Sequence, residues 1–145
     1  MPLRNILAKN LITCKPETGV RDVARLMKEK EVGAILVIEQ KKPIAIVTDR
    51  DLALRCLTDL KDISLMTAED VMSGGVETVS DDEGIYDVIE KMRRSRVRWV
   101  PVVNAVGEAV GILSFDDIFE LIAEEVGAMK EVVRPREPKL VDQAA

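Results

Sequence analysis

Apolar residues recur in two stretches of the chain with the spacing of an amphipathic helix. Each set occupies positions i, i+3, i+4 and i+7: Val20, Val23, Ala24 and Met27 in one stretch, and Ile85, Val88, Ile89 and Met92 in the other. Polar turns with acidic residues precede both stretches, at residues 15–19 and 80–84, and acidic side chains suit the positive end of a helix dipole. The pattern therefore predicts two helices of similar construction.

Short apolar runs rich in β-branched residues follow each predicted helix in pairs. They span residues 34–38 and 44–47 in the first half, and 100–103 and 110–113 in the second. Two such runs across a polar loop are typical of a hairpin, and their continuous apolarity indicates strands buried on both faces. A further helix is expected after each hairpin, over residues 49–57 and 116–126. The predicted class is α/β (α+β), in the order β-α-β-β-α.

The two halves are copies of one unit. Residues 13–38 align with residues 78–103 at an offset of 65, and Thr48 and Asp51 align with Ser114 and Asp117 at an offset of 66. One inserted residue in the second loop explains the change of offset, since surface loops accept insertions. A unit of roughly 60 residues buries too little surface to be stable alone, so two copies should pack sheet to sheet with pseudo-two-fold symmetry.

The repeats suggest an organisation into three segments. Repeat 1 is expected at residues 1–66 and repeat 2 at residues 67–127, with a short helix in the linker 61–72. Residues 128–145 contain two prolines and many charges, and are expected to form a partly disordered tail or a partner-binding arm.

Composition narrows the classes of function. Hydrophobic residues make up 47% of the chain and aromatic residues only 3%, so the core must be aliphatic. The net charge of −5 argues against nucleic-acid binding, which needs a basic face. No apolar run approaches the roughly 18 residues of a membrane span, and residues 1–10 lack the long apolar stretch of a secretory signal. A soluble cytoplasmic protein is expected, without a membrane partner.

Catalysis and metal binding find little support. The chain has no histidine, which removes the commonest general base and the commonest metal ligand. It also has no glycine-rich phosphate loop and no evident nucleophile–base pair. With only Cys14 and Cys56, a structural zinc site is not expected, and both cysteines are interpreted as free thiols. We therefore expect neither an enzyme nor a resident metal or cofactor.

Several segments resemble the CBS motif, named after cystathionine β-synthase. The stretches AIVTDRDL (45–52) and GILSFDDI (111–118) are similar to the signature that ends each CBS motif. VRWVPVV (97–103) resembles the second-strand signature of that family, and EDVMSGGVETV (69–79) resembles its entry to a second motif. The resemblance covers about residues 5–127. It implies a CBS pair, or Bateman module, which forms disc-shaped homodimers, binds adenosine compounds between the repeats and regulates an enzyme or transporter.

The paired [Thr/Ser]-x-x-Asp segments have two interpretations. As helix starts they are capping boxes, in which Thr48 and the acidic residue three positions on bond each other's backbone. The resemblance implies in addition that Asp51 accepts hydrogen bonds from ribose hydroxyls, and that Thr48 lies near the phosphate. We expect the first site to consist of nine residues: Ile46, Thr48, Arg50 and Asp51 from repeat 1, and Val76, Glu77, Thr78, Arg98 and Trp99 from repeat 2. Arg50 and Arg98 would be phosphate cations, and Trp99 would stack on the adenine or serve as a packing residue.

The second site should differ from the first. The resemblance places Ser114 and Asp117 there, together with Ile12, Thr13, Gly33 and Ala34. Asp116 stands where the first repeat has Arg50, and two carboxylates without an adjacent cation repel phosphate unless Mg²⁺ intervenes. We expect this site to be empty, metal-assisted or selective for a less charged ligand.

Two functions of different classes remain. The first is a regulatory module that senses AMP, ADP or ATP, with or without Mg²⁺, or another adenosyl ligand such as S-adenosylmethionine or NAD, and transmits its state to an unknown partner. The second is a structural dimerisation module with vestigial clefts.

Overall fold

The order β-α-β-β-α occurs twice in the chain, as the repeat predicts. The computed structural model describes residues 3, 7 and 11–133. The first half contains β1 (Thr13–Cys14), α1 (Val20–Lys30), β2 (Ala34–Glu39), β3 (Lys42–Thr48) and α2 (Asp49–Thr58). The second half contains β5 (Val79–Ser80), α4 (Ile85–Ser95), β6 (Trp99–Val103), β7 (Ala109–Ser114) and α5 (Phe115–Val133). Between them lie the 3₁₀ helix η2 (Ile63–Leu65), α3 (Ala68–Val71) and β4 (Ser73–Gly74).

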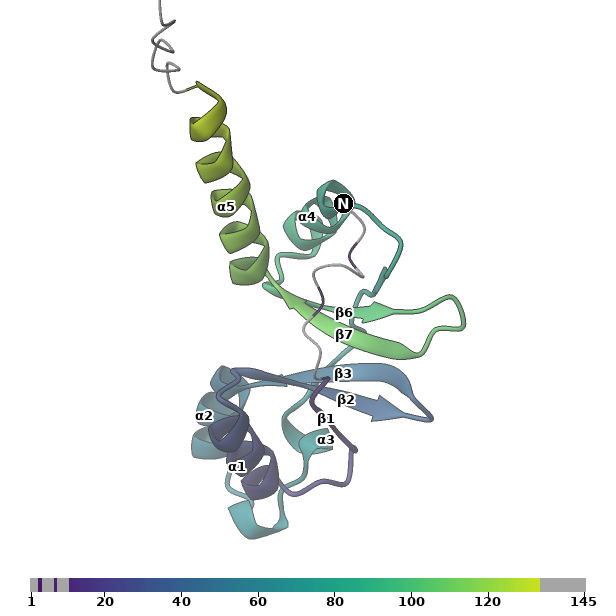
Figure 1. The fold of residues 1–145 in the computed structure, drawn as a ribbon. Coiled ribbons are helices and arrows are strands. Elements are labelled where there is room, and N and C mark those ends of the chain that lie inside the picture. Colours follow the sequence, from purple (N-terminus) through teal and green to yellow (C-terminus); the bar gives the residue numbers. More distant parts are fainter. Residues whose placement is uncertain (1–2, 4–6, 8–10, 134–145) are drawn as a thin grey trace, which may run out of the picture.

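The strands form two sheets that face each other across the middle of the molecule, with the helices on the outer sides (Figure 1). The first sheet has the order β1-β2-β3-β4, and the second has the order β5-β6-β7. In each, a short leading strand pairs in parallel with the first strand of an antiparallel hairpin. The expected sheet-to-sheet arrangement of an α+β fold is confirmed.

The two halves agree down to single residues. Helices α1 and α4 both follow a glycine and both end at a non-glycine residue in the left-handed region, Glu31 with φ 55° and Arg96 with φ 52°. These two residues are 65 positions apart, which is the offset of the sequence repeat. The predicted apolar faces of the helices pack against the sheets, where Val23 and Met27 and their counterparts Val88 and Met92 are buried.

Three apolar clusters form the core. One lies between the first sheet and its helices, and one lies between the second sheet and its helices. The third joins the sheets: Ala34, Leu36 and Ile46 of the first pack against Trp99 and Ile112 of the second. A hydrogen bond of 2.8 Å from the Ala109 N–H to the Lys41 carbonyl also links the two hairpins. The two repeats therefore share a buried interface, which fixes the position of one sheet relative to the other.

The segment between the repeats packs with the first sheet. Met66, Ala68 and Val71 belong to the first core, and β4 pairs with β3. The linker helices α3 and η2 bear out the short helix expected within residues 61–72. In the second half, Leu3 and Leu7 from the start of the chain enter the core there. Each half thus takes in residues that precede the other half's leading strand: β4 joins the first sheet, and Leu3 and Leu7 enter the second core.

The last helix extends beyond its expected end. It was expected to stop near residue 126, with a tail from residue 128, but α5 continues to Val133. A single Gly127 weakens a helix by about 1 kcal/mol without ending it, and Ala128, Met129, Lys130 and Glu131 are good helix formers. The expected end of this helix near residue 126 is therefore wrong. The tail's role as a partner-binding arm stays a prediction, and residues 134–145 lie outside the described residues. No helix within residues 11–133 has the length and apolarity needed to cross a membrane.

Candidate functional site

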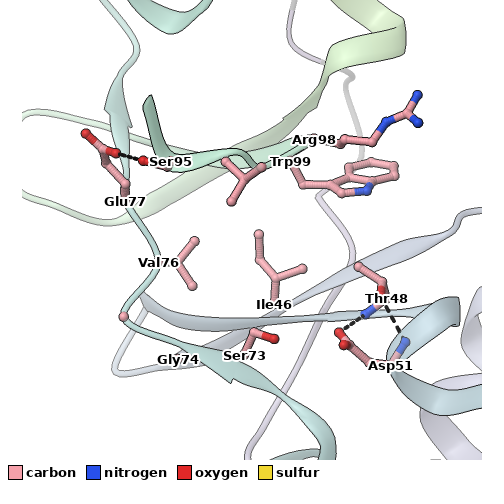
Figure 2. A pocket seen from close by; sticks show the side chains of 12 residues that line it. Ile46, Thr48, Asp51, Ser73, Gly74, Val76, Glu77, Ser95, Arg98 and Trp99 are labelled. Atoms are coloured by element: carbon pink, nitrogen blue, oxygen red, sulfur yellow. Dashed lines mark hydrogen bonds between the residues drawn. The ribbon is translucent and has the colours of Figure 1, made fainter. Parts of the chain in front are cut away.

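A cleft of about 440 Å³ opens between the two repeats (Figure 2). This volume is within the range of small-molecule sites. Its walls come from β3 and the start of α2 in the first repeat, and from the β4–β5 connection and the α4–β6 connection. The lining residues are Ile46, Thr48, Asp51, Ser73, Gly74, Gly75, Val76, Glu77, Ser95, Val97, Arg98 and Trp99.

Thr48 and Asp51 form one end of the cleft. The Thr48 Oγ1 accepts a hydrogen bond of 3.1 Å from the Asp51 N–H, and the Asp51 Oδ2 accepts one of 2.9 Å from the Thr48 N–H. This is the expected capping box, and it holds the Asp51 carboxylate at the wall of the cleft. The side chain of Asp51 is 17% exposed. Its second oxygen, Oδ1, lies 3.8 Å from the Arg55 Nε and can accept hydrogen bonds from a molecule in the cleft.

The N-terminus of α2 offers few backbone donors to an anion. The Asp49 N–H donates to the Gly33 carbonyl at 2.9 Å, and the Arg50 N–H donates to the Asp49 Oδ1 at 2.8 Å. The Asp51 N–H is taken by Thr48. All three donors that would ordinarily cradle a phosphate at a helix start are therefore used within the protein. Cationic side chains are left as the means of holding a phosphate at this end.

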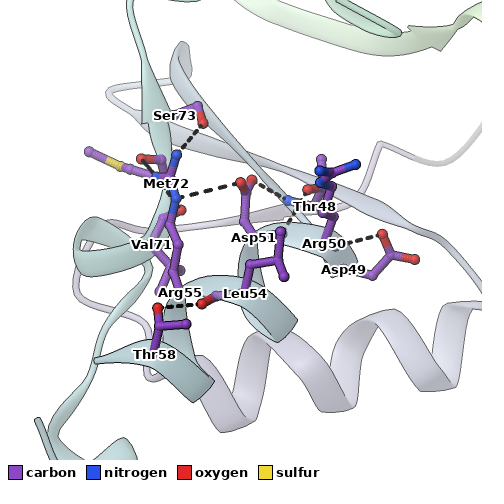
Figure 3. A network of polar contacts seen from close by, with 10 residues as sticks. All are labelled: Thr48, Asp49, Arg50, Asp51, Leu54, Arg55, Thr58, Val71, Met72 and Ser73. Carbon is purple, nitrogen blue, oxygen red and sulfur yellow. Dashed lines mark hydrogen bonds and ion pairs between the residues drawn. The ribbon is translucent and has the colours of Figure 1, made fainter. Parts of the chain in front are cut away.

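Arg55 links Asp51, at one end of the cleft, to the segment 71–73 that leads into β4 (Figure 3). Its Nη1 donates to the carbonyls of Val71 and Met72, both at 2.9 Å, and its Nη2 lies 3.4 Å from the Ser73 Oγ. Its Nε is 3.8 Å from the Asp51 Oδ1. One guanidinium thus spans from the carboxylate on α2 to the segment that leads into β4. The sequence repeat contains no signal for this role, because the contact joins parts 16 to 18 residues apart.

The opposite end of the cleft carries a second carboxylate. The Ser95 hydroxyl donates to the Glu77 carboxylate, and both residues line the cleft. Figure 2 shows this pair across the cleft from Thr48 and Asp51, with Ile46 and Val76 between the two ends. Ile46, Val76 and Trp99 belong to the apolar cluster between the sheets. The cleft is therefore apolar in its middle and polar at both ends.

Arg98 lines the cleft, but its guanidinium is directed to its own repeat. Its Nη2 donates to the Asp116 Oδ1 at 3.0 Å, and its Cζ lies 5.9 Å from the centroid of the Phe115 ring. The expectation that Asp116 and Asp117 have no adjacent cation is thus wrong, because strand β6 brings Arg98 beside the start of α5. Both partners of this ion pair are exposed, and such pairs contribute only about 0–1 kcal/mol. Little free energy therefore opposes a turn of Arg98 toward the cleft.

Seven of the residues expected at the first site meet in this cleft: Ile46, Thr48, Asp51, Val76, Glu77, Arg98 and Trp99. Two do not line it. Arg50 is exposed on α2. Thr78 is half-buried, and its carbonyl accepts a hydrogen bond of 3.3 Å from the Lys91 Nζ. The lining residues not expected are Ser73, Gly74, Gly75, Ser95 and Val97. All of them except Ser95 lie in the 69–79 and 97–103 segments, whose resemblance to family signatures was the signal that could have found them.

The residues expected at the second site lie in several different environments. Ser114 and Asp117 form a capping box like that of the first repeat, with bonds of 2.9 and 3.0 Å. Ile12 packs on the first core, Ala34 lies between the sheets, and Gly33 faces Asp49. Thr13 lines a different hollow beside α1. The counterparts of Ser73, Gly74 and Gly75 at an offset of 65 are residues 8–10, which lie outside the described residues. Within the described ranges, no group of three or more potential metal ligands is found.

Comparison with known proteins identifies the fold. The model of the CBS domain matches residues 3–57 and 68–124, which is more than half of the chain. The chain belongs to the CBS domain family. It is 29% identical over 116 residues to the CBS domain-containing protein YhcV of Bacillus subtilis. The aligned region covers 80% of this chain and 81% of YhcV.

Solved CBS pairs have the same architecture. The CBS domain protein PAE2072 from Pyrobaculum aerophilum, complexed with AMP, superimposes with a TM-score of 0.73 at 28% identity, over 86% of this chain and 99% of that one. The CBS domain pair of protein MJ0100, in complex with 5′-methylthioadenosine and S-adenosyl-L-methionine, gives a TM-score of 0.76 at 25% identity, over 86% and 98% of the two chains. The cleft described above thus lies in a CBS pair.

Proposed function

We propose that this CBS pair is a regulatory module that binds an adenosyl compound in the cleft between its repeats. The observation that carries the proposal is the Asp51 carboxylate, which the capping box holds at the wall of a cleft of suitable volume. Two of its structural relatives are complexes with AMP, or with 5′-methylthioadenosine and S-adenosyl-L-methionine. Ligands of this class share an adenosine, and the cleft has the chemistry to hold one.

The shape of the cleft suggests how adenosine would lie. Its ribose would place two hydroxyls against Asp51, since a carboxylate offers two oxygens to vicinal hydroxyls and charge-assisted bonds are the stronger kind. The base would lie between the sheets among Ile46, Val76 and Trp99. Its amino group would then face Glu77, whose carboxylate is an acceptor held by Ser95. This orientation proposes Glu77 as the residue that favours adenine over a base with a carbonyl at that position.

The substituent at the 5′ position would extend toward Thr48. Two cations lie near this end, Arg50 on the outer side of α2 and Arg98, whose present ion pair is exposed. Because the backbone donors at the start of α2 are already bonded, AMP, ADP or ATP would depend on these two side chains, or on Mg²⁺ held between phosphate and carboxylates. An uncharged or cationic substituent, as in methylthioadenosine or S-adenosylmethionine, would need neither.

Regulation follows from the location of the cleft. Its walls come from both repeats, so a ligand that contacts both would change the free energy of their relative arrangement. A protein partner that binds one arrangement of the repeats more tightly than another would then respond to the ligand. The alternative is a structural module whose cleft stays empty, and the two functions make different predictions about ligand-induced stability.

Thermal unfolding with AMP, ATP, S-adenosylmethionine and methylthioadenosine tests the proposal. A ligand at 100 times its Kd stabilises the native state by about 2.7 kcal/mol, which raises Tm by roughly 5–15 °C for a chain of this size. We expect at least one compound to produce such a shift. Asp51→Asn, which keeps an acceptor for the Thr48 N–H, should weaken binding about 10–100-fold.

Asp49→Asn is the matched control, because Asp49 is exposed in the same helical turn and does not line the cleft. It should leave binding unchanged. Absence of a shift with all four compounds would favour the structural module. Equal losses in Asp49→Asn and Asp51→Asn would remove Asp51 from the site, and unchanged discrimination between AMP and inosine monophosphate in Glu77→Gln would contradict the proposed orientation of the base.

A further inference from the structure

Arg98 is the one cation among the described residues that line the cleft. The lining also contains the carboxylates of Asp51 and Glu77, and the backbone donors at the start of α2 are bonded within the protein. Figure 2 shows Arg98 at the same end of the cleft as Thr48 and Asp51, where the 5′ substituent of an adenosyl ligand would lie in the proposed orientation. The affinity for a phosphate at that position therefore depends on where the Arg98 guanidinium is directed.

The start of α5, and not the cleft, holds the Arg98 guanidinium in the structure. Its Nη2 donates to the Asp116 Oδ1 at 3.0 Å, and its Cζ lies 5.9 Å from the centroid of the Phe115 ring. The Phe115 N–H also donates to the Arg98 carbonyl at 2.8 Å, so the backbone keeps Arg98 beside the start of α5. A phosphate in the cleft would have to compete with Asp116 for this side chain.

The first repeat has no equivalent of this ion pair. At the offsets of the repeat, 65 and 66, Gly33 stands in place of Arg98, and Arg50 stands in place of Asp116. The backbone hydrogen bond at this point is present in both halves, at 2.9 Å in the first and 2.8 Å in the second. The local fold therefore does not require the ion pair. Stability is also a weak reason for it, because the two side chains are 71% and 77% exposed.

We infer that Asp116 is a specificity-determining residue of the cleft, which competes with a 5′ phosphate for Arg98 and so lowers the affinity for adenine nucleotides. This role rests on the proposed function, since it requires an adenosyl ligand in the cleft. An exposed ion pair changes an equilibrium by up to about 5-fold, which sets the size of the effect. An uncharged 5′ substituent, as in 5′-methylthioadenosine, makes no demand on Arg98. The competition therefore favours adenosyl compounds without a 5′ phosphate, by acting against those that have one.

Isothermal titration calorimetry of the full chain with AMP and with 5′-methylthioadenosine tests the role of Asp116. Asp116→Asn keeps the size of the side chain but removes its charge, which leaves Arg98 free to reach a phosphate. We expect the Kd of AMP to fall about 3–5-fold, and the Kd of methylthioadenosine to change by less than about 1.5-fold. Glu120→Gln is the matched control, because it removes an exposed carboxylate one turn further along α5 that does not line the cleft. It should leave both Kd values unchanged.

A double-mutant cycle separates competition for Arg98 from direct repulsion between Asp116 and the phosphate. In an Arg98→Met background, Asp116→Asn should affect the Kd of AMP no more than Glu120→Gln does. A gain in AMP affinity that persists without Arg98, equal gains for the two compounds, or no gain for AMP would each overturn the role of Asp116. Binding of methylthioadenosine would leave the proposed function standing in all three cases. If neither compound binds the wild type or Asp116→Asn, the proposed function fails, and the role of Asp116 fails with it.

Discussion

Substitution of Arg55 by methionine should loosen the cleft as well as destabilise the protein. The guanidinium of Arg55 donates to two carbonyls at 2.9 Å, those of Val71 and Met72, and reaches the Ser73 Oγ at 3.4 Å (Figure 3). Methionine preserves much of the apolar stem of the side chain but removes every donor. The segment leading into β4 then loses its attachment to α2.

The magnitude follows from these contacts. Hydrogen bonds to a charged group contribute about 1.5–3 kcal/mol each when they are well shielded. Here the arginine side chain is 47% exposed, so water can replace part of each bond. The ion pair with Asp51, at 3.8 Å, adds little on a surface. We therefore expect Arg55→Met to lower the free energy of unfolding by about 1–2 kcal/mol, and Arg55→Lys, with one compact donor group, to retain part of it.

Urea denaturation at pH 7 measures the loss, and titration with an adenosyl ligand that binds the wild type measures the effect on the cleft. Binding should weaken about 3–10-fold in Arg55→Met, because both Asp51 and the β4 wall lose a support. Arg50→Met is the matched control on the same helix, and should change stability by less than about 0.5 kcal/mol. If Arg55→Met and Arg50→Met have equal effects on stability, the network in Figure 3 does not hold the cleft together.

Two further predictions concern ionisable groups. Burial raises the pKa of Cys14 to about 11, so its thiol should react with a disulfide reagent at pH 8 at least about 100-fold more slowly in the native protein than in urea, and similar rates would contradict its burial. Burial opposes ionisation of Glu83, but hydrogen bonds from Lys91 at 2.8 Å and from the Ser80 N–H at 3.0 Å outweigh it and lower the pKa of this carboxyl from 4.5. The stability that Glu83 contributes is therefore full above pH 4.5 and is lost as pH falls through its lower folded pKa. Glu83→Gln should be less stable than the wild type at pH 7, with a difference that shrinks below about pH 4, and a difference independent of pH between 3 and 7 would refute this linkage.

Much of the fold could be predicted from local patterns. The spacing of Val20, Val23 and Met27, repeated 65 positions later, identified the amphipathic helices, and the paired apolar runs identified the hairpins. The capping boxes at Thr48 and Ser114 were equally legible, because both partners of each lie within four residues. The end of α5 was not, since Gly127 is a weak signal that the helix formers beyond it override.

The composition of the cleft was only partly predictable. Thr48, Asp51 and Val76 lie in segments that resemble family signatures, and this resemblance was sufficient to predict that they belong to one site. Ser95 had no such signal: its counterpart in the first repeat is Lys30, and it reaches Glu77 only because α4 ends beside the β4–β5 connection. The direction of the Arg98 side chain, toward Asp116, depends equally on which strand lies beside which helix.

The sequence by itself determined the duplicated unit, the class of fold and the family, because these depend on the spacing of apolar residues and on contacts between residues close along the chain. The tertiary structure alone decided that Arg55 joins Asp51 to the segment that leads into β4, that Arg98 forms an ion pair with Asp116, and that Phe119, Val126 and Met129 of α5 lie exposed. Such contacts depend on the packing of the two sheets, which brings together residues separated by many positions. Apolar residues with helical spacing have the same sequence pattern whether they are buried or exposed. Only the three-dimensional structure shows which of them belong to the core.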